Sequence, residues 1–312
     1  MDRLIEDTAE RIFADHVDKG VLDRAESGEF PNALWDVVRE SGLHLVGSAQ
    51  SGTEPVDLYG VLRIAGRHAV PLPLAEVLVA NSLLDEAGFI TIAADGVAPW
   101  ARVADGVLTV DGEFSRRFET EPDTNLAGES RDRVVLVDAE RVGLPDDLRE
   151  RLALSRVALM AGCLERILAM AIDFATEREQ FGRPISRFQA VQHNLAVLAG
   201  ETAAARCACD GAVANVDSSG FVHHVAAAKA RVGEAAGVAA EIVHQVHGAM
   251  GFTHEHSLHH FTRRLWAWRD EFGREGRWQE TLGRRIAAGG ADALWDFVVD
   301  PSPHISPSRL WS

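Results

Sequence analysis

The 312-residue chain is 46% hydrophobic and 25% charged, which is ordinary for a globular protein. It has no apolar run of about eighteen residues and no basic-then-apolar start, so neither a membrane span nor a signal peptide is expected. Residues 1–150 hold 30 acidic and 14 basic residues, whereas residues 151–312 hold 17 of each. This balance disfavours nucleic-acid binding.

The three cysteines, Cys163, Cys207 and Cys209, fit a reduced, cytoplasmic compartment. Cys207 and Cys209 lie two positions apart, on different faces of a helix, and match no zinc spacing. We therefore expect them to be small buried hydrophobic residues.

Residues 1–88 predict an N-terminal helical domain. Apolar residues recur at spacings of three and four between Leu4 and Phe13, as on one face of a helix. Pro31 suits the first turn of a second helix, which Ser41 and Gly42 end. Residues 56–69 and 74–87 predict two further helices.

Residues 89–142 predict a small, reduced β domain. The segments 90–96, 106–112 and 133–138 are short, β-branched runs, and Asp-Gly turns bound the first two. A segment of this length can form only a small sheet. Residues 122–130 read as a polar loop.

Residues 143–300 predict a C-terminal helical bundle. An apolar stripe runs from Val157 to Phe174. Long helices are expected over 189–216 and 221–249, since these segments are rich in Ala and Val and almost free of Gly. Shorter helices are expected over 258–268 and 278–299. The Pro-rich residues 301–312 predict an extended tail.

Two of the predicted bundle helices are joined by a turn with unusual side chains, Arg178 to Ile185, followed by Phe188 and Gln189. The planar guanidinium of Arg178 could grip a pyrophosphate through two parallel hydrogen bonds. Phe181, three residues later, could lie against a flat ring. The alternative is an ordinary helix–helix turn in which Arg178 makes a surface ion pair.

A second motif runs from Gln245 to Phe252. Gly248 and Gly251 lack side chains, which would let the backbone approach a ligand closely. The alternative is a Gly-rich break between two helices.

A dense group of histidines surrounds this motif and continues beyond it: His244, His247, His254, His256, His259 and His260. Together with Glu255 they raise the alternative of a metal site. No His-Glu-x-x-His spacing occurs, so we expect no metal. The His-Glu-His step also suits helix capping, for which Thr253 is a candidate.

Together these two motifs resemble the flavin-contacting segments of the acyl-CoA dehydrogenase family. The resemblance implies a mostly α fold with a helical lobe, a β lobe and a helical bundle, an FAD cofactor and α,β-desaturation of an acyl-CoA thioester. It further implies that Arg178, Phe181 and Gln189 contact an FAD held mainly by a neighbouring subunit. The segment from Gln245 through Gly248 to Gly251 would do the same. The family pattern is Gln-x-x-Gly-Gly-x-Gly-Phe, and here Ala249 replaces its second Gly.

The chain departs from the family where the catalytic base is expected. In many members the base is a Glu followed by Gly and Thr, and counting from Gln245 places Phe272 there. Glu271 is one residue off, which on a helix is a rotation of about 100°. The helix that carries the base in other members matches residues 151–156, where no acid is in register and Glu150 is the nearest. Residues 88–142 also lack the Gly-rich acidic stretch with which members hold the flavin ring.

These departures suggest a short subunit of a heteromeric acyl-CoA dehydrogenase of lipid metabolism. A larger homologue would supply the base and the flavin-ring pocket, in an arrangement similar to the α2β2 heterotetramers of steroid side-chain degradation. The expected partners are this homologue, an acyl-CoA substrate such as a steroid-CoA, and an electron-transfer acceptor. One alternative is a self-sufficient homo-oligomeric dehydrogenase that uses Glu271 or Glu255 as base. Another is a flavin-free helical scaffold.

Overall fold

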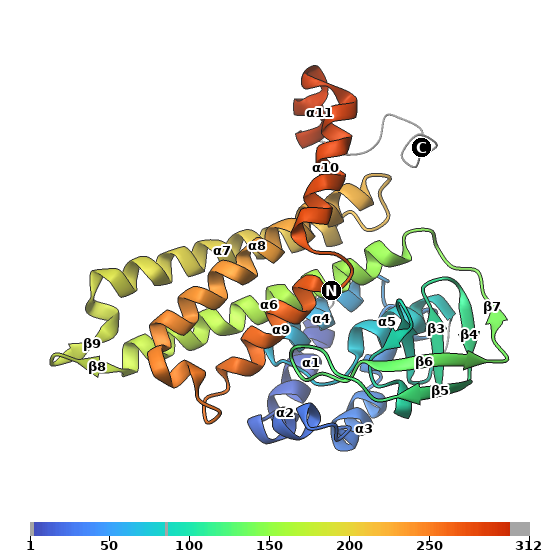
Figure 1. The fold of residues 1–312 in the computed structure, drawn as a ribbon, viewed down its shortest axis with the longest axis horizontal. Coiled ribbons are helices and arrows are strands. Elements are labelled where there is room, and N and C mark those ends of the chain that lie inside the picture. Colours follow the sequence, from blue (N-terminus) through green and yellow to red (C-terminus); the bar gives the residue numbers. More distant parts are fainter. Residues whose placement is uncertain (1–2, 85–86, 300–312) are drawn as a thin grey trace.

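The computed structural model describes residues 3–84 and 87–299, in which helices predominate (Figure 1). The predicted tail, 301–312, lies outside the described residues. The N-terminal helices are α1 (Arg3–His16), α2 (Lys19–Glu26), α3 (Asn32–Glu40), α4 (Asp57–Arg67) and α5 (Leu74–Leu84). No helix in the described ranges is long and apolar enough to span a membrane.

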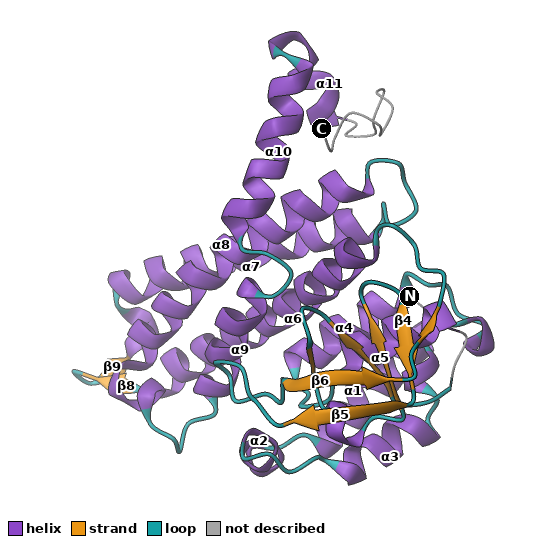
Figure 2. Cartoon of the chain, turned by 45° about the vertical axis from the view of Figure 1, so that its right-hand side comes forward, coloured by secondary structure: helices purple, strands orange, loops and turns teal. Residues whose placement is uncertain are grey.

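Two small sheets follow the N-terminal helices (Figure 2). Their strands are β1 (Ile90–Ala93), β2 (Val97–Ala98), β3 (Gly106–Thr109), β4 (Glu113–Ser115), β5 (Arg117–Glu121), β6 (Asp132–Val137) and β7 (Glu140–Arg141). One sheet has the order β1-β3-β4-β7, with β1 and β3 parallel, and the other has the order β2-β6-β5. The three predicted segments contain β1, β3 and most of β6, but the short strands β2, β4 and β7 lie outside them. The longer β5 was also missed, because its alternation of polar residues resembles a loop.

The rest of the described chain is dominated by long helices (Figure 1). They are α6 (Leu148–Glu177), α7 (Gln189–Val213), α8 (Phe221–His247), α9 (Leu258–Asp270), α10 (Glu275–Gly289) and α11 (Leu294–Val299). A two-stranded hairpin of β8 (Glu179–Gln180) and β9 (Arg183–Pro184) joins α6 to α7. Helices α10 and α11 project away from the bundle in both ribbon views.

The helical prediction was wrong in one place and the cysteine prediction in another. The helix expected over 278–299 is interrupted at Gly290, whose positive φ of 75° ends α10. Cys163 and Cys209 are buried as expected, but Cys207 is exposed. Cys207 lies two residues before Cys209 on α7, and that spacing turns it to the opposite side of the helix.

The N-terminal helices and the bundle share one hydrophobic core, and two glycines set how closely they pack. A Cβ added at Gly66 on α4 would lie 2.0 Å from the carbonyl oxygen of Leu159 on α6. A Cβ at Gly162 on α6 would lie 1.8 Å from the carbonyl oxygen of Arg63 on α4. The two helices therefore cross with their backbones in contact, which only small residues permit.

Candidate functional site

The turn that carries Arg178 and Phe181 is a tight β-hairpin at the end of α6. Phe181 and Gly182 occupy its two central positions with φ of 52° and 78°, the positive values that a two-residue hairpin turn requires. Glycine adopts this conformation freely, but a phenylalanine is strained there. The Phe181 ring meets the ring of Phe188 edge-on, with centroids 6.1 Å apart, but its side chain is 92% exposed, so the described chain covers little of it.

The second motif reaches the same end of the bundle. Asn194, near the start of α7, donates a hydrogen bond of 3.4 Å to Gln245 on α8. Phe174, in the last turn of α6, stacks on His247, the last residue of α8, with ring centroids 4.5 Å apart. These contacts bring the end of α6, the start of α7 and the end of α8 together, beside the hairpin in Figure 1.

The side chains singled out at this end are mostly exposed and largely without partners. Arg178, Phe181, Gln189 and Gln245 are all exposed. The Arg178 side chain makes no hydrogen bond or ion pair with residues 3–84 or 87–299, so the alternative of a surface ion pair finds no support there. Phe252, at the end of the second motif, is 73% exposed. The rings of Phe181 and Phe252 contact Phe188 and His244, but most of their surface stays exposed beside the Arg178 guanidinium.

The glycines of the second motif have different roles. Gly248 ends α8 with a φ of 58°, and a Cβ there would meet nothing within 4 Å. A Cβ at Gly251 would lie 2.9 Å from the Cβ of His247, so packing within the chain requires this glycine. Close approach of a ligand is therefore not needed to explain Gly251. Ala249 is exposed.

The histidines have three different surroundings: some stack on aromatic rings, one caps a helix, and two lie near an aspartate. His244 stacks on Phe252, with ring centroids 4.5 Å apart. His256 Nδ1 accepts a hydrogen bond from the backbone N–H of Leu258, so His256, and not Thr253, caps the start of α9. Thr253 donates instead to the carbonyl of Met250. His259 and His260 come close to Asp23 of α2.

The position expected for the catalytic base is a strained turn at the end of α9. Phe272 has a φ of 56° and Gly273 a φ of 105°. The ammonium of Lys229, only 1% exposed, donates to the carbonyls of Trp268, Arg269 and Gly273 at 3.2, 2.7 and 3.0 Å. Burial lowers the pKa of Lys229 to about 7. A lysine of α8 therefore holds the turn in place.

Glu271, the acid nearest the base position, is bound by two guanidiniums. Arg156 Nε lies 2.5 Å from its Oε2, and Arg131 Nη2 lies 2.7 Å from its Oε1. Burial alone would raise the pKa of Glu271, but the two guanidiniums outweigh it and hold that pKa at about 2. A general base works best with a pKa near the operating pH, so this carboxylate is poorly suited to remove a proton.

The ion pairs continue through the junction of the lobes. Arg156 also binds Glu76 of α5, and both side chains are buried. Glu129 accepts from the Trp268 indole at 3.0 Å and lies 3.3 Å from Arg264, whose other nitrogen lies 2.6 Å from Glu26. Several of these residues line a cavity of about 30 Å³, close to the volume of one water molecule. Paired charges thus fill this part of the interior.

An open cleft of about 540 Å³ lies beside the Glu271 turn. Its lining includes Arg131, Arg156, Glu271, Phe272 and Arg277. The second zone considered for a base, residues 151–156, presents the Arg156 cation to this cleft. Glu150 does not line it.

The other candidate base, Glu255, belongs to a different place. Glu255 is exposed in the loop before α9, whereas Glu271 follows the last residue of α9. The 13 residues of α9 span about 20 Å, so the two carboxylates lie at opposite ends of this helix. They are therefore not parts of one site.

Sequence reasoning missed the buried ionic residues. Their only signal was a charge inside an apolar stretch, as at Arg156 within 152–164, Lys229 within the Ala-rich α8, and Arg264 between Phe261 and Leu265. Buried cations of this kind need partners. Arg156 pairs with Glu76 and Glu271, and Arg264 with Glu26 and Glu129. Lys229 binds backbone carbonyls at the end of α9. All these partners are far away in the sequence, so the pairing could not be inferred.

Residues 146–287 match the acyl-CoA dehydrogenase family in the region described as "Acyl-CoA dehydrogenase, C-terminal domain". Among curated proteins, Acyl-CoA dehydrogenase IpdE2 of Mycobacterium tuberculosis is 29% identical over 218 residues, which are 64% of this chain and 67% of IpdE2. The alignment with IpdE2 of Mycolicibacterium smegmatis covers 52% of each protein.

Solved structures extend the similarity to the whole fold. The ChsE4-ChsE5 complex from Mycobacterium tuberculosis has a chain that superposes with a TM-score of 0.81 at 20% identity, covering 93% of this chain and 99% of that one. A variant of the Tcur3481-Tcur3483 steroid ACAD gives a TM-score of 0.80 at 20% identity, with 91% and 97% covered. The structure of PigA with FAD and proline superposes with a TM-score of 0.78 at 16% identity, covering 93% of this chain and 100% of that one.

The three-lobed, mostly helical fold is that of the acyl-CoA dehydrogenases. Residues 146–287 belong to that family, so the resemblance that the motifs indicated is confirmed. The predicted fold class is confirmed with it.

Proposed function

We propose that this chain is the short subunit of a heteromeric, FAD-dependent acyl-CoA dehydrogenase. In this proposal Arg178, Phe181, Gln189 and the segment 245–251 contact the nucleotide end of an FAD that a larger homologous subunit holds. The larger subunit supplies the carboxylate base. The substrate is an acyl-CoA thioester, and the steroid enzyme among the structural relatives favours a bulky acyl group.

The observation that carries the proposal is the contrast between the exposed hairpin and the ion-paired position where the base is expected. The Arg178–Phe181 hairpin exposes a guanidinium and a strained aromatic ring to solvent. A guanidinium suits a pyrophosphate, an aromatic ring suits a flat heterocycle, and the amides of Gln189 and Gln245 suit hydroxyl and carbonyl groups. The guanidinium, the aromatic ring and the two amides together therefore suit the nucleotide end of FAD.

The residues at the base position do not fit a complete active site. Phe272 has no proton acceptor, and Glu271 is ion-paired to two arginines. Desaturation requires a carboxylate to take the α-proton while the β-hydrogen leaves as hydride and a carbon–carbon double bond forms. FAD, when bound, supplies the hydride acceptor. The proton acceptor must then come from another chain, and the relatives named for two components, ChsE4-ChsE5 and Tcur3481-Tcur3483, support such a partner.

Expression with and without a partner tests the proposal. The chain would be purified alone and together with a larger acyl-CoA dehydrogenase homologue from the same genome, and FAD per chain would be measured. We expect no FAD on the chain alone, and fewer flavins than chains in the complex. A yellow homo-oligomer that is bleached by acyl-CoA would refute the need for a partner.

The cross-subunit contact is tested in the purified complex. Arg178→Ala should weaken FAD binding by about tenfold or more, because it removes charge-assisted hydrogen bonds. Arg166→Ala is the matched control, since Arg166 is an exposed arginine on α6, the helix that Arg178 directly follows. Equal flavin content in both variants would rule out the proposed role of Arg178.

The self-sufficient alternative makes a different prediction for Glu271. If Glu271 were the base, Glu271→Gln would abolish turnover while the flavin stayed bound. Turnover that survives in a folded Glu271→Gln complex excludes Glu271.

A further inference from the structure

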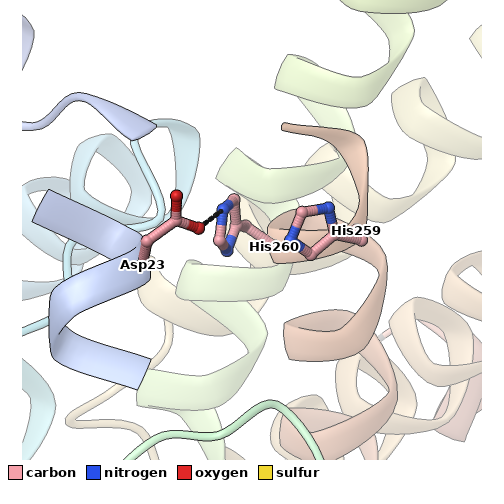
Figure 3. Close-up of side chains that lie close together, drawn as sticks. All are labelled: Asp23, His259 and His260. Carbon is pink, nitrogen blue, oxygen red and sulfur yellow. Dashed lines mark ion pairs between the residues drawn. The ribbon is translucent and has the colours of Figure 1, made fainter. Parts of the chain in front are cut away.

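A cluster outside both motifs places two imidazoles and a carboxylate together. Figure 3 shows Asp23 of α2 facing His260 of α9, with the ring of His259 beside it. Each residue offers one potential ligand atom, and these atoms all lie within 4.8 Å of one another. His260 is completely buried, His259 is half-buried and the Asp23 side chain is 47% exposed.

The hydrogen bonds of His260 leave one ring nitrogen available. Its Nδ1 lies 2.7 Å from Glu26 Oε1, so Nδ1 carries the proton that this carboxylate accepts. The opposite nitrogen, Nε2, is buried and has no hydrogen-bond partner in the described structure. A histidine whose Nδ1–H is held by a carboxylate, with a free Nε2, has the arrangement of histidines that bind metals.

His259 is oriented in the same way. Its Nδ1 lies 2.8 Å from the backbone carbonyl of His256, which fixes the proton on Nδ1 and leaves Nε2 as an acceptor. The two rings are adjacent, with centroids 4.0 Å apart. Each imidazole therefore keeps Nε2 as an acceptor, and the two rings lie side by side.

The spacing between His260 and Asp23 favours a cation between them. His260 Nε2 lies 3.2 Å from Asp23 Oδ1, yet the two atoms are not aligned for a hydrogen bond. An unprotonated nitrogen facing a carboxylate oxygen is repulsive unless a positive charge lies near both. Ligands on a tetrahedral zinc, with bonds of about 2.0–2.1 Å, are about 3.3 Å apart, which is close to this distance.

Other charges surround the cluster. Lys19 lies 2.5 Å from Asp23 Oδ2, so only Oδ1 is directed at the histidine. Arg264 and Arg263 bind Glu26, at 2.6 and 3.2 Å. Arg264 shares Glu26 Oε1 with His260 Nδ1, whereas Arg263 engages Oε2. Lys19 engages Asp23 Oδ2 and leaves Oδ1, which faces His260, to another ligand.

We propose that Asp23, His259 and His260 form a binding site for a divalent transition metal of the zinc class. Two imidazoles and one carboxylate are ligands that Zn²⁺, Co²⁺ and Ni²⁺ accept. Solvent completes the coordination on the exposed side of Asp23. The site links α2 of the N-terminal helices to α9 of the bundle, so a bound ion acts as a structural clamp between them.

Metal titration of the full chain tests the site. After treatment with a chelator, the chain would be titrated with Co²⁺, followed by the visible absorption of the ion, and then with Zn²⁺ by calorimetry. We expect one ion per chain and a higher melting temperature with the ion bound, because it binds the folded state only. Absence of saturable binding would overturn the proposal and leave a proton between His260 and Asp23.

Variants locate the ion. His259→Ala and Asp23→Asn change side chains that are not fully buried, and each should weaken binding by about tenfold or more. The matched controls are His193→Ala on α7 and Asp36→Asn on α3, both exposed, and they should bind as the unaltered chain does. Binding that persists unchanged in the Asp23→Asn, His259→Ala double variant would place the ion elsewhere and refute the site.

Discussion

Two turns of this molecule differ in the surroundings of their side chains. The hairpin at Phe181 holds its guanidinium and aromatic ring in solvent, whereas the turn at Phe272 lies beside a set of paired charges. Both turns place a phenylalanine at positive φ, 52° at Phe181 and 56° at Phe272. At Phe272, contacts inside the chain account for the strain, since the ring covers the guanidinium of Arg156 at 5.2 Å and Lys229 binds the carbonyls around it.

The comparison teaches where to look for an outside partner. A strained backbone persists when its surroundings compensate for it. The Phe272 turn has that compensation from Arg156 and Lys229, whereas the Phe181 ring, 92% exposed, has an edge-on contact with Phe188 that covers little of it. The exposed turn is therefore the one that we expect another molecule to complete.

The largest expected effect is at Arg156. Arg156→Met would leave Glu76 and Glu271 without their shared cation, and we expect the free energy of unfolding to fall by about 3–5 kcal/mol. Arg166→Met on the exposed face of the same helix should change it by less than about 0.5 kcal/mol. Urea denaturation measures both. An equal loss of unfolding free energy in the two variants would mean that the buried ion pairs of Arg156 stabilise the fold no more than an exposed arginine does.

A smaller loss of folding stability is expected when acid protonates Glu271. The pKa of Glu271 is about 2 in the folded chain, against 4.5 for an ordinary glutamate. Its stabilisation is therefore complete above about pH 4.5 and is lost as the pH falls toward 2, amounting to about 3 kcal/mol. Unfolding should be followed in urea from about pH 6 to about pH 3.

The matched variants assign this acid sensitivity. Glu271→Gln should make the pH dependence shallower, because no titrating carboxylate remains between the two arginines. Glu26 keeps its own contribution, because its burial is outweighed by hydrogen bonds and charge from His260 and Arg264, which also hold its pKa at about 2. Glu140→Gln, an exposed acid on β7, should leave it unchanged. A slope that is the same in Glu271→Gln as in the unaltered chain would show that other carboxylates carry the effect.

The smallest change in stability is expected at Phe181, where a substitution that relieves backbone strain should also remove a contact with FAD. Asparagine tolerates positive φ, so Phe181→Asn should leave the stability of the chain unchanged or raise it by up to about 1 kcal/mol. Phe261→Ala, in the buried core, should cost about 3–5 kcal/mol. In the complex, Phe181→Asn should nevertheless reduce FAD content. A clear loss of stability at Phe181 would show that the ring supports the fold of its own chain.

Much of the fold could be predicted because its signals are local. Apolar periodicity located the long helices, and β-branched runs located β1, β3 and β6. Helix α10 was extended too far, since a single Gly290 between two helical patterns gives a weak signal. Strand β5 was missed because it alternates charged and polar residues and depends on pairing with β6.

The site could be predicted only in part. The motifs at Arg178 and Gln245 are contiguous in sequence, and the structure places both at one end of the bundle; their contact with FAD stays a prediction. The state of Glu271 depends on Arg131 and Arg156, which lie 140 and 115 residues away. Asp23 comes to His260 across an even longer stretch of the chain. No local pattern reports such pairings.

Lysine is scarce in this chain, so chemical labelling of Lys229 can be used to measure local opening of the structure. The sequence contains only Lys19 and Lys229. Lys19 is partly exposed, whereas Lys229 is enclosed between α8 and the end of α9. An amine-directed label should react with Lys19 in the folded protein and reach Lys229 only when that corner opens. The rate at which Lys229 is labelled would therefore measure how often the Phe272 turn opens, without any substitution in the chain.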